Sequence, residues 1–172
     1  MRSMGTVASA SLLAAMVTGG LGAAPSALGS DDGDPVNGTY IATSVGEWAT
    51  TNESFHDEPT VHSTWTITTS CTTAQDCSGQ VTSDQGWSAP LIKHDGTVWF
   101  LRRDVPNWES CPDGTAATGH QVIYFIPVGQ DGMVQHGSST LAGQDKTTGP
   151  SGACGANRWL VIAMPFRLDK LP

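Results

Sequence analysis

Basic residues are scarce in this sequence. Lysine and arginine together number 8 among 172 residues, against 16 aspartates and glutamates, so the net charge at pH 7 is −8. Proteins that bind nucleic acid or an anionic membrane surface carry a basic footprint. We therefore expect neither of these partners for this chain.

Signatures of catalysis and of metal binding are also missing. The sequence contains no G-x-S-x-G nucleophile elbow and no C-x₂-C pair. The acidic run SDDGDPVN lacks the spaced ligands and the distal glutamate of a calcium loop. We expect no metal and no cofactor, and the motifs identify no chemistry.

The sequence has one long apolar run, at its N-terminus. Arg2 precedes an acid-free stretch whose apolar centre starts at Val7 and leads into small residues. This pattern is typical of a secretory signal peptide, and the run is too short and glycine-rich to span a bilayer of about 30 Å. We predict a signal peptide at 1–29, cut between Ala24 and Ser30, with an uncleaved N-terminal anchor as the alternative. After cleavage we expect a secreted, extracytoplasmic protein without membrane insertion.

The remaining chain reads as one domain. Residues 30–37 have the composition of a flexible lead-in, and 38–172 are long enough to bury a core of their own. Charged residues are sparse, whereas threonine, serine and glycine are abundant, which favours strands and turns over helices.

Short segments with β-like patterns follow one another along this domain, separated by turn residues. Asp95-Gly96 predicts a type I′ hairpin, and 45–55 is the one helix candidate. Hairpin-length links without a βαβ rhythm indicate an all-β fold, a single antiparallel meander of about eight strands. Its architecture is a small up-and-down barrel or a sandwich, and we favour the barrel. The predicted strands are 38–45, 60–70, 78–83, 87–93, 97–103, 121–128, 133–141 and 158–168.

The four cysteines predict two disulfide bonds. Cys71 and Cys77 bracket five residues between two strand-like segments, where a local bridge would pin the turn. Cys111 and Cys154 lie in loops rich in proline or glycine, and we expect them to pair with each other. An oxidising compartment and the absence of supporting histidine spacing argue against zinc.

Six tryptophans are many for a chain of this length. We expect three of them to lie in strands and to be buried in the core: Trp65, Trp99 and Trp159. The other three lie near turns, where exposed aromatic rings could bind a ligand or simply plug the barrel ends. These candidate ligand-binding residues are Trp48, Trp87 and Trp108.

Several motifs together resemble small exported proteins of mycobacteria and related actinobacteria, most of them without known function. The motifs are WTITTSC at 65–71, a cysteine followed by G-x-V-x-S at 77–83, GWS at 86–88, CPDGT at 111–115 and SGACG at 151–155. The first two are also similar to extracytoplasmic modules attached to some actinobacterial Ser/Thr kinases. The resemblance implies export and a β fold, and it implies no activity.

A weaker resemblance is to calycin barrels such as lipocalins. These proteins open with G-x-W on their first strand and place a late arginine over that ring. Here Gly38-Thr39-Tyr40 holds the first position, with tyrosine for tryptophan, and Arg158 or Arg167 could supply the cation. The resemblance concerns shape alone.

The sequence leaves two hypotheses about function. The first is a secreted, disulfide-stabilised, non-enzymatic binding or interaction protein with a small-ligand cavity or an aromatic rim. Its partner would be an unknown small molecule or a cell-envelope component. The alternative is a small extracytoplasmic hydrolase using His56, Asp57 and Glu58, or Ser151. A histidine and a carboxylate from distant segments meeting in one concavity would favour the hydrolase.

Overall fold

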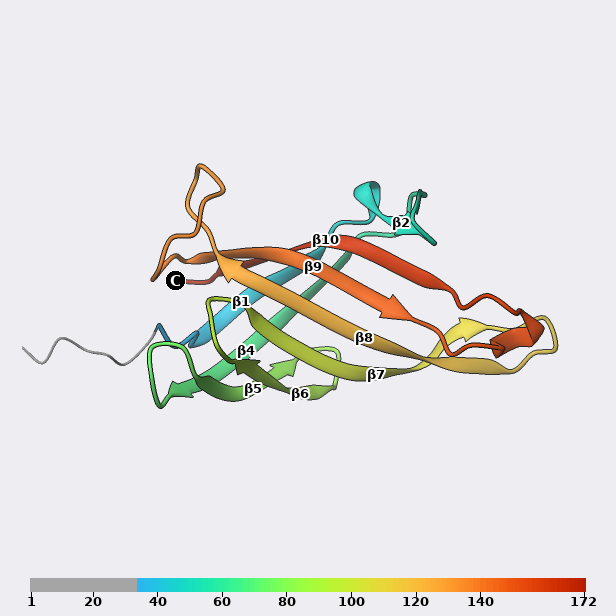
Figure 1. Cartoon of the computed structure of the whole chain (residues 1–172), viewed down its shortest axis with the longest axis horizontal. Coiled ribbons are helices and arrows are strands. Elements are labelled where there is room, and N and C mark those ends of the chain that lie inside the picture. Colours follow the sequence, from blue (N-terminus) through green and yellow to red (C-terminus); the bar gives the residue numbers. More distant parts are fainter. Residues whose placement is uncertain (1–33) are drawn as a thin grey trace, which may run out of the picture.

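An eight-stranded antiparallel sheet closes on itself in the computed structural model, which describes residues 34–172 (Figure 1). The predicted signal peptide at 1–29 and the first residues of the predicted lead-in lie outside the described residues. The barrel strands are β1 (Gly38–Ser44), β4 (Val61–Cys71), β5 (Cys77–Ser83), β6 (Ser88–Lys93), β7 (Trp99–Ser110), β8 (Ala116–Pro127), β9 (Thr140–Thr148) and β10 (Val161–Lys170).

Each barrel strand pairs with the next one along the chain, and β1 closes the barrel against β10. In this closing ladder Tyr40 lies opposite Lys170 and Ser44 lies opposite Phe166. The prediction of an all-β up-and-down barrel is therefore confirmed. No helix among residues 34–172 has the length and apolar character needed to cross a membrane.

The middle of the barrel is filled with side chains. Alternate residues of each strand point inward, and an eight-stranded barrel leaves room for little more than its own side chains. Trp65 lies 5.2 Å from Phe166 and Phe125 lies 5.9 Å from Phe166, between ring centroids. Two cavities, described below, lie at opposite ends of this filled interior. The largest fully buried residues are Trp65, Trp99, Phe125, Ile67, Leu91, Leu101, Ile123, Leu141, Leu168 and Val81.

Two glycines let neighbouring strands approach closely. A β-carbon on Gly79 would lie 2.0 Å from the carbonyl oxygen of Thr68, and one on Gly143 would lie 1.8 Å from that of Tyr124. Any other residue would force the strands apart, so these glycines allow the tight curvature of the wall.

The chain leaves the barrel wall between β1 and β4. Residues 45–55, the helix candidate, form a 3₁₀ turn, η1 (Gly46–Trp48), and a small hairpin of β2 (Thr50–Thr51) and β3 (Ser54–Phe55). β2 pairs with residues 162–163 of β10, beyond the segment 166–170 that pairs with β1. The helix candidate is therefore wrong except for this single turn, because the extended residues gain a sheet partner.

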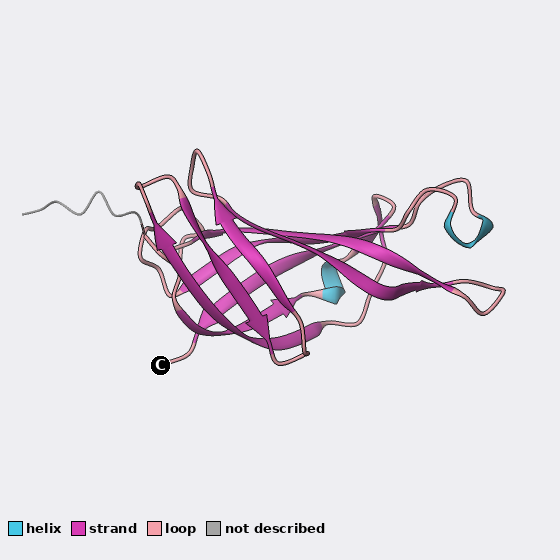
Figure 2. Ribbon diagram, turned by 90° about the horizontal axis from the view of Figure 1, so that it is seen from below, coloured by secondary structure: helices cyan, strands magenta, loops and turns pink. Residues whose placement is uncertain are grey.

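The β7–β8 hairpin extends well past the other strands and forms an arm, residues 104–120 (Figures 1 and 2). A register shift between Val105 and Glu109 bends β7 at the base of the arm. The Cys111–Cys154 disulfide links the far turn of the arm to η2 (Ala153–Gly155). With the Cys71–Cys77 bridge also present, both predicted pairings are confirmed.

Three local predictions are wrong. Segment 133–141 is mainly an exposed loop, and the strand of this region, β9, starts at Thr140. Asp95-Gly96 lies in a five-residue loop in which Asp95 alone has a positive φ, 51°. Trp159 precedes β10 and is 53% exposed, whereas Trp65 and Trp99 are buried as predicted.

Candidate functional site

A cavity of about 270 Å³ lies at the barrel end where β4 turns into β5, β6 into β7 and β8 into β9. We call it the Lys93 cavity. Its wall combines apolar side chains with two lysines, including Val36, Tyr40, Lys93, Trp99, Leu141 and Lys170.

Lys93 is the unusual member of this wall because it points into the barrel. The alternation of β6 turns Ala89, Leu91 and Lys93 inward, and Lys93 is 5% exposed. Its Nζ donates a hydrogen bond to the carbonyl oxygen of Ala74 at 3.0 Å and lies 5.3 Å from the centre of the Trp99 ring. An ammonium group has three donors. No carboxylate of residues 34–172 lies within ion-pair distance of it, so Lys93 is a buried cation without a counter-ion.

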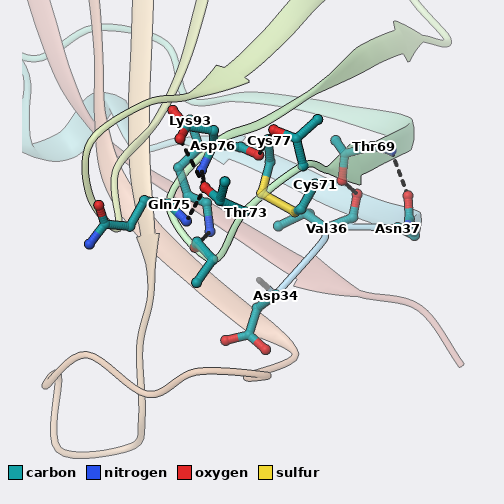
Figure 3. The surroundings of a disulfide bond; sticks show 12 residues. Asp34, Val36, Asn37, Thr69, Cys71, Thr73, Gln75, Asp76, Cys77 and Lys93 are labelled. Carbon is teal, nitrogen blue, oxygen red and sulfur yellow. Dashed lines mark hydrogen bonds between the residues drawn. A yellow bond between two sulfur atoms is a disulfide. The ribbon is translucent and has the colours of Figure 1, made fainter. Parts of the chain in front are cut away.

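The loop 72–76 holds the acceptor for Lys93 in place (Figure 3). Cys71 and Cys77 are direct neighbours across β4 and β5, and their disulfide closes this loop. The Thr73 hydroxyl accepts hydrogen bonds from the backbone N–H groups of Gln75 and Asp76. Hydrogen bonds from Thr73 and His94 lower the pKa of the Asp76 carboxyl. The short bridge therefore fixes one side of the Lys93 environment.

Residues just before β1 and at the end of β10 form another side of the cavity. The Thr69 backbone N–H donates to the Asn37 side chain at 2.6 Å, and the Thr69 hydroxyl donates to the Val36 carbonyl at 3.1 Å (Figure 3). Lys170, at the end of β10, places its Nζ 6.0 Å from the Tyr40 ring. Burial raises the pKa of the Tyr40 hydroxyl, which keeps this wall residue neutral.

A histidine and a carboxylate from distant segments meet at the rim of this cavity. His136 Nδ1 lies 2.8 Å from the Asp34 carboxylate, and both side chains are largely exposed. Ser138 and Ser139 line the same cavity. The Ser138 hydroxyl donates to the Val128 carbonyl at 2.6 Å, and no hydroxyl of the described chain is hydrogen-bonded to His136.

The opposite barrel end holds a closed polar network. Asp145 accepts hydrogen bonds from Ser44 at 2.7 Å and from Gln121 at 2.8 Å, and Arg103 donates to Gln121. Burial raises the pKa of Asp145, although these hydrogen bonds and the charge of Arg103 oppose the rise. Burial also lowers the pKa of Arg103, whose guanidinium lies 4.2 Å from the Trp87 ring. The space left is about 30 Å³, enough for roughly one water molecule. This network satisfies its own members and leaves no ligand site.

The predicted ligand-binding tryptophans do not come together. Trp48 is 69% exposed on η1, and Trp87 packs edge-on against Trp65 at 5.4 Å. Trp108 lies in the arm and packs tightly on Gly119, where a β-carbon would lie 2.7 Å from its ring. Of the three, Trp87 alone lines one of the four main cavities found among residues 34–172.

Of the residues predicted for a hydrolase, the structure brings His56 and Glu58 together. His56 lies 3.3 Å from Glu58 in the loop after β3, and neither they nor Asp57 line any of the four main cavities of residues 34–172. Ser151 is exposed in the loop before η2. His56 and Glu58 therefore form an ion pair in one loop, and Ser151 lies in another.

One group of side chains could hold a metal ion by distance. Ligand atoms of Asp76, His94 and Asp95 lie within 4.8 Å of one another. His94 and Asp95 are exposed, and the two ring nitrogens of His94 face different carboxylates. The arrangement is that of a surface ion-pair cluster, and we assign no metal to it.

The sequence reasoning missed Lys93 and its neighbours. The sequence does contain a sign of it. Ala89, Leu91 and Lys93 are alternate residues of a predicted strand and so point to the same face, and a lysine on a core-facing side is uncommon. Tyr40 was noted as a first-strand aromatic, but the cation above it is Lys170. Arg158 and Arg167 both lie elsewhere on the surface.

Comparisons with known proteins identify the fold and no family. No family model matches this sequence, and no curated protein matches it. Among solved structures, the chain is similar to the monomer form of the M. tuberculosis PknI sensor domain, with a TM-score of 0.56. The identity is 19%, and the match covers 80% of this chain and 88% of that chain.

Proposed function

We propose that the protein is an extracytoplasmic, non-enzymatic binding module that holds a small ligand in the Lys93 cavity. The observation that carries the proposal is the buried ammonium group of Lys93 without a counter-ion. Burying an unpaired charge is costly, so an anionic group bound in the cavity would offset that cost. The barrel interior is filled elsewhere, so a ligand would bind at this end.

An extracytoplasmic location is supported by the cysteines. All four form disulfides, which persist in oxidising compartments and are rare in the cytosol. The fold shared with a domain described as a sensor agrees with a binding role. Cleavage of a signal peptide at 1–29 stays a prediction, and N-terminal sequencing of secreted protein tests it: a start between Pro25 and Asp31 is expected.

Native mass spectrometry of protein purified from its own secreting host tests the binding role. We expect a co-purified small molecule on the wild type. Thr97→Trp should fill the cavity, which Thr97 lines, and remove the adduct. Thr118→Trp is the matched control, because Thr118 is exposed on the arm. An adduct that persists in Thr97→Trp, or that is absent from the wild type, contradicts the proposal.

If the protein were a hydrolase, the Asp34–His136 pair would be the place in the structure for its active site. A hydrolase would use His136 as general base, oriented by Asp34, and a nearby serine such as Ser139 as nucleophile. Ester hydrolysis of p-nitrophenyl acetate distinguishes the two functions. We expect wild type, His136→Ala and Ser139→Ala to hydrolyse it equally slowly. A wild-type rate lost in both variants would make the protein an enzyme.

A further inference from the structure

We infer that the ligand of the Lys93 cavity is a small amphiphile with one carboxylate. The carboxylate would pair with Lys93 and Lys170, and the apolar part would pack against Tyr40, Trp99 and Leu141. This inference rests on the proposed function and adds the chemical class of the ligand.

The first support is the distribution of charge. The whole chain has 8 basic residues against 16 acidic ones, yet two lysines line one cavity, and neither forms an ion pair with a residue of 34–172. Asp34 is the one carboxylate of the wall, and it is engaged by His136 at 2.8 Å. An acidic protein that leaves two cations together at one cavity presents a site for an anion.

The second support is the kind of donors. Lysine offers a point charge that can bind either a carboxylate or a phosphate, and phosphate sites commonly add arginine forks or the backbone N–H groups of a helix N-terminus. The wall of the Lys93 cavity contains no arginine and no helix. A singly charged headgroup fits these donors better than a phosphate dianion.

The third support is the apolar part of the wall and its size. Tyr40, Trp99 and Leu141 are buried members of the core and also line the cavity. A volume of 270 Å³ holds about nine groups of the size of a water molecule, each about 30 Å³. This limits the ligand to a short chain or a single ring, and octanoate is a probe of that size.

The experiment compares octanoate with octan-1-ol, which has the same chain without the charge. Both are titrated by calorimetry into the protein in its secreted form. We expect wild type to bind octanoate at least about tenfold more tightly than octanol, and Lys93→Met to lose about that factor for octanoate alone. Lys170→Met should lose less because Lys170 is exposed. Lys93→Arg keeps the charge and should retain octanoate binding.

Lys146→Met is the matched control, because Lys146 is an exposed lysine on β9 that does not line the cavity. Its octanoate binding should equal that of wild type. Thermal unfolding of each variant checks that Lys93→Met is folded. If it is not, the contrast between octanoate and octanol in the wild type and the Lys170→Met result still decide the question.

Equal binding of octanoate and octanol, or octanoate binding that survives both Lys93→Met and Lys170→Met, overturns the inference and leaves the proposed function standing. Displacement of octanoate by an equal concentration of inorganic phosphate also overturns it. If neither probe binds, the adduct seen by native mass spectrometry decides. If the adduct is a carboxylic acid, the inference is supported. If it is any other molecule, the inference is overturned and the proposed function stands. If wild type carries no adduct, both the inference and the proposed function are overturned.

Discussion

Removing the Cys111–Cys154 bridge should destabilise the protein more than removing the Cys71–Cys77 bridge. The two bridges have sequence separations of 43 and 6. If each acts by restricting the unfolded chain, its contribution grows with the logarithm of loop length, giving about 4 kcal/mol for the long loop and about 2.2 kcal/mol for the short one. For a domain of this size, these values lower Tm by about 14 °C and about 8 °C.

The structure sharpens this difference. Cys71 and Cys77 face each other at the end of the β4–β5 hairpin, so residual hairpin in the unfolded chain would shrink the entropic effect of their bridge. The long bridge joins the arm to a loop between β9 and β10, where local structure gives no such help. The expected gap between the two bridges is therefore a lower bound.

The assay is urea and thermal unfolding of two double variants, C111S/C154S and C71S/C77S, followed by tryptophan fluorescence and circular dichroism. The m-value should also rise more without the long bridge, because the unfolded chain then exposes more surface. Equal losses of stability, or a larger loss for C71S/C77S, would refute the reasoning from the unfolded state.

Three further changes test other parts of the fold. Because burial raises the pKa of Asp145 above the usual value of about 3.9, the folded state holds that proton more tightly than the unfolded state. Wild type should therefore gain stability relative to Asp145→Asn as the pH falls from about 7 toward about 4 in urea unfolding, and a flat difference contradicts this. Gly119→Val should cost about 1–3 kcal/mol in the same assay, because its β-carbon would lie 2.7 Å from the Trp108 ring, whereas Gly96→Ala, with open space, should be neutral. Trp99→Ala should cost about 3–5 kcal/mol and Trp159→Ala less than about 0.5 kcal/mol, and similar losses would show that the burial assignment is wrong.

Alternation in the sequence located the strands whose inward positions are apolar. β1, β4, β5 and β6 lie within one or two residues of their predicted bounds. β9 was missed because two of its buried residues, Asp145 and Thr147, are polar, and Asp145 accepts hydrogen bonds from Gln121. Met133 and Val134 suggested a strand, but they are exposed in the loop before it.

The alternation of apolar and polar residues was not enough to predict the candidate site. The alternation along β6 shows that Lys93 points inward. Whether a carboxylate lies beside it depends on the side chains of all the segments that surround it. Those segments, from residue 34 to residue 170, are brought together by barrel closure. The same holds for Arg103 and Asp145, which lie two strands apart and meet through Gln121. Pairings of this kind follow from register, and register cannot be read from one strand at a time.

The seam between β1 and β10 sets an order on folding. It joins Ser44 to Phe166, 122 positions later in the chain. β1 therefore cannot pair on this side until β10 has been synthesised. Until then β1 and β9 are open sheet edges that other chains can capture. The barrel can therefore close only after β10 has been synthesised, and pairing across so long a stretch of chain slows folding.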